Sequence, residues 1–151
     1  MATIEDATGG LNEERLADLE MQWGVALPSA FRQFLLTHNG GYPVPDAFTL
    51  VGSEDGSSVH RFLGVEVGSH SNLENYMKTY ESRIPNDLFP IAHDPGGNLV
   101  CIGTGGSNMG RIFFWDHETE MDQGPPNYSN VSAIADSFDD FLDGLYEVNL
   151  D

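Results

Sequence analysis

The most informative part of the chain is WGVALPSAFRQFLLTHNGG, residues 23–41, because it holds the end of one expected helix and all of the next. Gly24 favours the left-handed backbone that closes a helix. Pro28 suits the first turn of the helix that follows, because proline there loses no hydrogen bond. Apolar residues at helical spacing predict the buried face of this second helix: Phe31, Phe34 and Leu35. The Asn-Gly-Gly run at 39–41 ends it, since these residues accept positive φ angles.

The segment before Gly24 predicts a first helix. Asn12 is a favourable N-cap, and the two acids that follow it suit the positive end of the helix dipole. Apolar residues at i, i+3 and i+7 mark the face that this helix buries: Leu16, Leu19 and Trp23.

Beyond residue 41, short apolar runs separated by turn-forming residues predict strands. The expected strands are 48–51, 60–65, 89–93, 99–102 and 111–115. We expect a third helix to begin at Ser71, with Glu74 completing a capping box, and to end before Pro85. A last helix is expected at about 133–148.

The order of these elements predicts an α+β fold. Two helices come first, strands and a third helix follow, and a helix closes the chain, which indicates a central, largely antiparallel sheet flanked by about four helices. The 151 residues suit a single domain, because a chain of this size buries enough surface to fold alone. We expect residues 1–10 to form an N-terminal tail and residues 11–151 to form the domain.

Four blocks in order resemble the SUKH superfamily, which includes the fungal cell-wall assembly regulators of the Smi–Knr type. The blocks are residues 23–41, 90–98, 110–118 and 137–142, within a match of roughly residues 11–147. The positions that carry the family motif are Trp23, Gly24, Leu27, Pro28, Asn39, Gly40, Gly41, Asp94, Gly97 and Asn98. Their residue types suit anchoring and turn formation, so we interpret them as scaffold positions.

The resemblance implies a central sheet ringed by helices. For most bacterial members it also implies immunity against a toxin delivered by a neighbouring cell, commonly a nuclease or a nucleic-acid deaminase. Some members have other binding roles, so the family leaves the toxin class open.

Charge is the strongest feature of the composition. Twenty-four acids stand against six bases, for a net charge of −18, and Lys78 is the only lysine. Such a charge repels nucleic-acid backbones and anionic membranes, so we expect neither as a partner. It favours fast encounter with a basic protein. The alternative is that the acidity only maintains solubility or reflects a salt-adapted host.

Two further features bear on location. The N-terminal residues Met1–Asp6 are acidic where a signal peptide needs basic residues, and no apolar run approaches the ~18 residues of a membrane span. We therefore expect a cytoplasmic protein.

Cys101, the single cysteine, lies in an apolar run, which predicts that its thiol is buried.

Catalytic or metal chemistry has weak support. His93-Asp94 and Asp116-His117 follow or end expected strands, but neighbours on a strand point to opposite faces, so at most one of each pair can face a shared site. No HExxH, paired CxxC or GxSxG motif occurs, and the glycine-rich run 103–108 has no lysine for a phosphate. We therefore expect a protein that is not an enzyme and that binds no metal or cofactor. An enzyme that uses these four residues remains a further hypothesis.

Acidic surfaces are the candidate partner-binding sites. On the expected last helix, one face carries Asp136, Asp140, Asp143 and Glu147. Repulsion among these acids and Asp139 would cost about 1–2.5 kcal/mol, which a basic partner would relieve. A second set lies in the loop after the last expected strand: Asp116, Glu118, Glu120 and Asp122. Glu54 and Asp55 form a third set. Solvated surface is the alternative for each set.

The sequence thus indicates a non-catalytic immunity protein that covers a basic, nuclease-type toxin with an acidic surface. The alternative is a scaffold or regulator in cell-envelope assembly, as among the fungal relatives. The sequence leaves the oligomeric state open.

Overall fold

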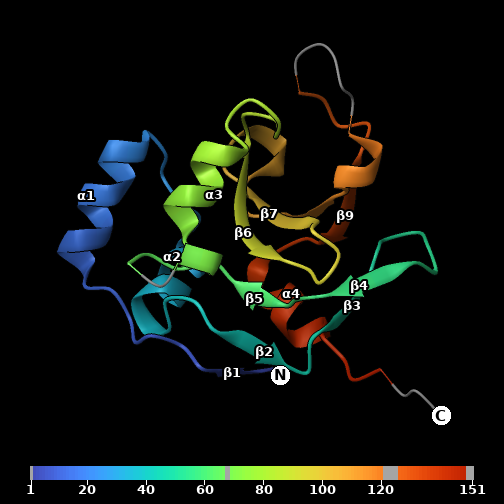
Figure 1. The fold of residues 1–151 in the computed structure, drawn as a ribbon, viewed down its shortest axis with the longest axis horizontal. Helices are drawn as coiled ribbons and strands as arrows, with labels where there is room; N and C mark the ends of the chain where they lie inside the picture. The colour runs from blue at the N-terminus through green and yellow to red at the C-terminus, as the bar shows by residue number, and fades with distance from the viewer. Residues whose placement is uncertain (1, 67–68, 121–125, 149–151) are drawn as a thin grey trace.

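The computed structural model describes residues 2–66, 69–120 and 126–148. Within them the helices are α1 (Glu13–Trp23), α2 (Ser29–Thr37), α3 (Leu73–Thr79) and α4 (Phe138–Gly144) (Figure 1). The strands are β1 (Thr3–Glu5), β2 (Tyr42–Val44), β3 (Ala47–Thr49), β4 (Gly56–Ser58), β5 (Arg61–Phe62), β6 (Leu88–His93), β7 (Leu99–Gly103), β8 (Ile112–Trp115) and β9 (Val131–Ala135). Short 3-10 turns are η1 (Ser69–Ser71), η2 (Gly106–Asn108) and η3 (His117–Thr119).

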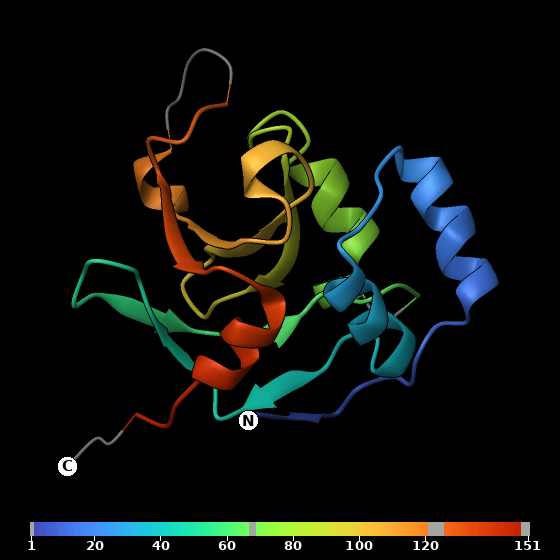
Figure 2. The ribbon, with the colours of Figure 1, turned by 180° about the vertical axis from the view of Figure 1, so that it is seen from behind.

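The main sheet is antiparallel, with strand order β5-β6-β7-β8-β9. Of the two smaller pairs, β1-β2 lies beside β5, where Gly41 bridges Phe62, and β3-β4 lies away from it on the side of β9, where Val51 donates to the Ala133 carbonyl (Figure 1, Figure 2). Together with the helices, this arrangement confirms the predicted α+β fold with a largely antiparallel sheet.

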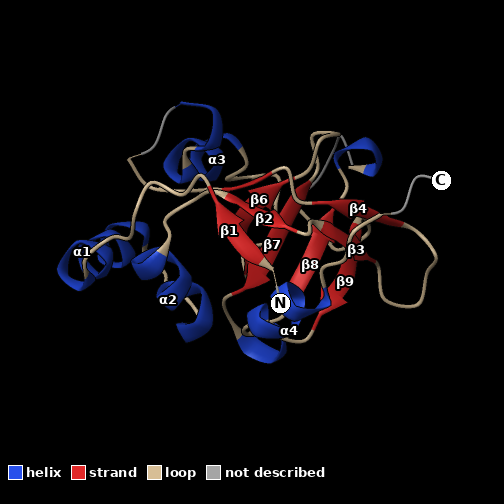
Figure 3. Cartoon of the chain, turned by 90° about the horizontal axis from the view of Figure 1, so that it is seen from below, coloured by secondary structure: helices blue, strands red, loops and turns tan. Residues whose placement is uncertain are grey.

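Both faces of the main sheet are covered. Every residue of β7 is buried, so its alternating side chains need a packed layer on each side. Val100 and Ile102 join the larger core with α2 and α4, whereas Leu99 and Cys101 join a smaller core with Trp115 and part of α3. Figure 3 shows α3 on one side of the sheet and α4 on the other.

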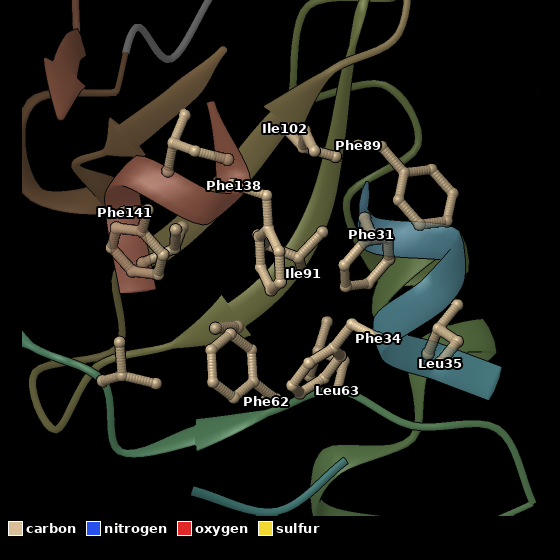
Figure 4. Packing of buried hydrophobic residues seen from close by; sticks show 14 of the residues in the cluster. Phe31, Phe34, Leu35, Phe62, Leu63, Phe89, Ile91, Ile102, Phe138 and Phe141 are labelled. Carbon is tan, nitrogen blue, oxygen red and sulfur yellow. The ribbon is translucent and has the colours of Figure 1, made fainter. Parts of the chain in front are cut away.

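An aromatic cluster joins the helices to the sheet, and Phe138 of α4 lies at its centre (Figure 4). Its ring centroid is 5.5 Å from that of Phe31, 5.3 Å from that of Phe34 and 6.0 Å from that of Phe62. Phe138 is 2% exposed. Edge-to-face pairs of this kind add stabilisation beyond burial alone.

The first two helices form as their end signals predict. The Asn12 side chain accepts a hydrogen bond from the Arg15 backbone nitrogen at 2.7 Å, and Gly24 closes α1 with φ of 69°. Pro28 stands one position before the first turn of α2. Asn39, 4% exposed, acts as a substitute strand partner, because its side chain exchanges two hydrogen bonds with the Val65 backbone at 2.7 and 2.8 Å.

Residues 3–5, within the segment expected to be a tail, form β1 and pair with β2. This pairing brings the backbone of Glu5 against Gly41, which has φ of 89°. A Cβ at Gly41 would lie 2.6 Å from the Glu5 carbonyl oxygen, so only glycine fits there.

The predicted last helix, 133–148, is wrong. Residues 131–135 are strand β9, paired with β8, and α4 covers only 138–144, with the Ser137 side chain accepting from the Asp140 nitrogen. Edge pairing to β8 satisfies the backbone of this segment, and Val131 and Ile134 are β-branched residues that suit a strand. Tertiary pairing thus overrides the helical spacing of the acids.

Other boundaries differ by less. The third helix begins at Leu73, capped by the Asn72 side chain rather than by Ser71. The expected strands 48–51 and 60–65 are shorter, as β3 and β5, while β2 and β4 were not predicted. Over residues 2–66, 69–120 and 126–148, no helix is both long and apolar enough to cross a bilayer.

We expect Phe138→Ala to lower the free energy of unfolding by about 3–5 kcal/mol, because it opens a cavity at the centre of the aromatic cluster. Urea denaturation followed by circular dichroism measures the change. Met21→Ala is the control, since Met21 is 81% exposed on α1, and should stay within about 0.5 kcal/mol of the wild type. Equal stabilities for the two variants would contradict the packing described here.

We expect Gly41→Ala to lower the free energy of unfolding by about 1–3 kcal/mol, since it adds backbone strain and a clash with β1. Gly144→Ala, in α4, meets nothing within 4 Å and should be level or more stable by up to about 1 kcal/mol. Thermal unfolding of both variants under one buffer condition gives the comparison, and a Gly41→Ala variant as stable as Gly144→Ala would refute the close approach of β1.

Candidate protein-docking surface

The five arginines of this chain are paired with carboxylates of the chain itself. Each arginine lies within ion-pair distance of a carboxylate. The pairs are Arg15–Glu66 (2.7 Å), Arg32–Glu13 (2.8 Å), Arg32–Glu20 (2.7 Å), Arg61–Asp6 (2.6 Å), Arg83–Glu120 (2.8 Å) and Arg111–Asp136 (3.6 Å). Exposed pairs of this kind add little stability. Because they neutralise the arginines, the charge of the remaining surface comes mainly from the other carboxylates.

The predicted acidic loop after β8 is only partly free. Arg83 donates to both carboxylate oxygens of Glu120, at 2.8 and 2.9 Å, and this hydrogen bonding lowers the pKa of Glu120. Arg83 also lies over the ring of Tyr80, 4.5 Å from its centroid. Glu120 therefore anchors its loop to α3 and the following turn.

The remaining acids of this loop differ from one another. The Asp116 side chain accepts from the Glu118 nitrogen at 2.9 Å and so caps η3. Glu118 itself is exposed and has no ion-pair partner among the described residues. Asp122 lies outside the described residues.

The predicted acidic helix face is corrected by the structure. Asp136 precedes the N-cap of α4 and its carboxylate, 87% exposed, lies 3.6 Å from Arg111. Glu147 lies beyond the end of α4, so Asp140 and Asp143 are the only two of the four that share a helix. Asp140 is in the first turn, where a negative charge is favourable. Within α4 only Asp139–Asp143 and Asp140–Asp143 remain at helical spacing, so the predicted repulsion falls to about 0.4–1 kcal/mol.

The loop and α4 occupy different sides of the molecule. Figure 1 and Figure 2 both place η3, in orange, well away from α4, in red, with the main sheet between them. The two acidic sets predicted from the sequence are therefore separate surfaces.

The second family block forms a closed turn. Asp94, 5% exposed, accepts hydrogen bonds from the Gly96 nitrogen, from the backbone and side chain of Asn98, and from the Ser57 hydroxyl. Burial alone would raise the pKa of Asp94, but the hydrogen bonds from Asn98, Ser57 and Gly96 outweigh it and hold the pKa below its ordinary value. The side-chain oxygen of Asn98 in turn accepts a hydrogen bond from the backbone nitrogen of His117 at 3.0 Å.

These contacts assign the residues of the enzyme reading to structural roles. His117 Nε2 lies 2.8 Å from the Gly96 carbonyl, which accepts its hydrogen. His93 hydrogen-bonds to the Ser71 hydroxyl at 3.0 Å and stacks on Tyr76. Burial, with a contribution from His60, lowers the pKa of His93. Asp94 and His117 thus both hold the 96–98 turn, whereas His93 bonds to Ser71 and Asp116 caps η3.

The described residues hold neither a cluster of metal ligands nor an exposed thiol. Across 2–66, 69–120 and 126–148, no group of three or more His, Cys, Asp or Glu side chains is placed to hold a metal ion. Cys101 is fully buried, and burial raises the pKa of its thiol, which disfavours the reactive thiolate.

Sequence reasoning missed an exposed apolar area near α4. Four large apolar side chains are 38–51% exposed there: Tyr42, Val44, Tyr146 and Val148. A pocket of about 360 Å³ lies among residues 42–46 and Glu147. Along residues 42–44 the side chains alternate between exposed, buried and exposed, as in a strand with one face in solvent. The sequence could have predicted that Tyr42 and Val44 share a face only if 42–44 had been identified as a strand.

Comparison with known proteins places the fold and the motif positions in context. A curated protein of Bacillus subtilis (strain 168), the SPbeta prophage-derived uncharacterized protein YokK, is 28% identical over 151 aligned positions, which cover 89% of this chain and 74% of that protein. Residues 10–144 match the SMI1 / KNR4 family (SUKH-1). This range includes α1 to α4, the whole main sheet and every motif position named above, so the chain belongs to the SMI1 / KNR4 family (SUKH-1).

Proposed function

We propose that this chain is a non-catalytic immunity protein, which binds a toxin delivered by a competing bacterium and covers its basic surface in the cytoplasm. The observation that carries the proposal is the pairing of every arginine with a carboxylate in a chain of net charge −18. The unpaired charges of the surface are then overwhelmingly negative, which suits a basic partner. Membership of a family that commonly supplies immunity proteins supports the same conclusion.

A nuclease-type toxin is the partner whose chemistry fits best. An enzyme that cleaves nucleic acid presents a positively charged cleft to the phosphate backbone. Carboxylates held on a rigid domain occupy such a cleft without being cleaved, and long-range attraction raises the rate of encounter. The mechanism needs no catalytic group on this chain, and Asp94, His93 and His117 keep their structural roles in it.

Of the three predicted acidic sets, we propose the side of α4 as the docking face. A typical partner covers roughly 800 Å² on one side of each protein, and α4 and η3 lie on different sides of the main sheet. Asp140, Asp143 and Glu147 are exposed and lack an ion-pair partner in the part of the chain that is described. By contrast, Glu120 already binds Arg83, and Asp116 already caps η3.

Co-expression with the protein encoded by the neighbouring gene tests the function. We expect growth to be restored and the two purified proteins to form a complex whose association rate falls steeply between low and high salt, since charge steers the encounter. Surface plasmon resonance at several salt concentrations gives the rate. A complex that forms without protecting growth would favour the scaffold or regulator reading, and no complex at all would overturn the proposal.

A pair of charge variants tests the docking face. We expect Asp143→Lys with Glu147→Lys to slow association about tenfold or more, because both changes place repulsive charge at the interface. The control, Glu118→Lys with Glu54→Lys, makes the same change in net charge on the other two acidic sets and should slow association by less than about threefold. Stopped-flow measurement compares the two, and a larger effect in the control would move the docking face to the loop.

A further inference from the structure

The exposed apolar area beside α4 is unusual for a chain this acidic. Among the described residues, eight large apolar side chains are exposed. Of these, Tyr42 and Val44 line one recess, and Tyr146 and Val148 flank Glu147, which lines the same recess. We call Tyr42, Val44, Tyr146 and Val148 the apolar patch. Interfaces owe much of their lifetime to a few apolar or aromatic side chains that are fully desolvated at the centre, with polar groups around them.

The patch is built on fixed backbone. Tyr42 and Val44 project on the same side of β2, which pairs residue by residue with β1. Tyr146 exchanges two backbone hydrogen bonds of 3.0 Å with Ala47, and its hydroxyl bonds to Thr49 at 2.7 Å. Side chains held in this way lose little conformational entropy when a partner covers them.

A recess lies within the patch. It has a volume of about 360 Å³ and is lined by Tyr42, Pro43, Val44, Pro45, Asp46 and Glu147. Four of the lining residues are apolar, and the other two are the exposed carboxylates Asp46 and Glu147. A recess of this shape accepts one bulky side chain from a partner, as interface anchors do.

The charges around the recess select the partner. Asp46 and Glu147 have no ion-pair partner in the described part of the chain, and Glu5 on β1 lies opposite Tyr42. Arg61 stands over the Tyr42 ring at 5.7 Å, but its charge is matched by Asp6 at 2.6 Å. The rim is therefore negative and complements a cationic surface.

We propose that the apolar patch is the anchor of the docking face and that its occupant is a basic surface segment of the toxin. This segment places one bulky apolar side chain in the recess. Arg or Lys residues on either side of that side chain reach Asp46 and Glu147. This inference rests on the proposed function. It extends the docking face from the acids of α4 to an apolar centre.

A second copy of the chain is the competing occupant, and charge disfavours it. Two-fold symmetric contact through the patch would bring Asp46 and Glu147 of one copy beside the same patch of the other. Like charges in contact destabilise such an interface, and each copy carries a net charge of −18.

Two valine substitutions provide the test. Val44 is 49% exposed in the patch, and Val51 is 66% exposed in the turn after β3. We expect Val44→Lys to raise the dissociation constant for the neighbouring gene product at least about thirtyfold, because it places a charge where the apolar anchor binds. Val51→Lys adds the same charge to a valine that is more exposed, and it should change the constant by less than about threefold. Isothermal titration calorimetry measures both.

The outcomes are distinct. If the wild type binds and Val44→Lys binds equally well, the patch is not the anchor, while the proposed function stands. If the wild type does not bind, both proposals fall. A wild-type dimer in size-exclusion chromatography with light scattering that Val44→Lys dissociates would make the patch a self-contact and overturn the inference. Val148→Lys, at a position 51% exposed beyond α4, is the second variant if Val44→Lys does not fold as judged by circular dichroism.

Discussion

The burial of both faces of β7 is the constraint on which the rest of the structure depends. All five of its residues are buried, and their side chains alternate between two cores. A strand of this kind requires helices on both sides of the sheet, so α3 takes one face while α2 and α4 take the other. The aromatic cluster around Phe138 is the means by which α4 and α2 meet the sheet. The centre of the domain is thus packed with apolar side chains, and the charged side chains lie at the surface.

On that surface, short-range pairing and long-range charge have different consequences. The arginines are held by carboxylates close at hand, and some of these contacts have a local purpose, such as the attachment of the 116–120 loop through Arg83 and Glu120. Once the arginines are matched, the excess of acids creates a field that extends about a Debye length into solution. Charge of one sign gives speed of encounter, whereas apolar contact gives lifetime. The molecule has both just beyond α4, where Glu147 lines the recess with Tyr42 and Val44.

The sequence was a good guide wherever structure is decided within a few residues. The caps at Asn12 and Gly24, the stop at 39–41, and the turn closed by Asp94 and Asn98 are local hydrogen-bonding devices, and each is present. The meander from β6 to β8 was also predicted, because its strands are consecutive and joined by recognisable turns. The prediction was wrong at 133–135, where the last helix was expected to begin and the chain instead completes strand β9. That segment becomes a strand because β8 offers it an edge, which no local pattern reveals.

By itself, the amino-acid sequence determined the fold class, the family, the net charge and the helix caps, since these depend on composition, periodicity and side chains only a few positions apart. Only the tertiary structure decided which carboxylates are free and where the exposed apolar side chains gather. Glu120 is neutralised by a residue 37 positions away, and Tyr146 reaches Thr49 across 97 positions. Contacts between such distant residues depend on how sheets and helices pack together, and spacing along the chain carries no direct record of that.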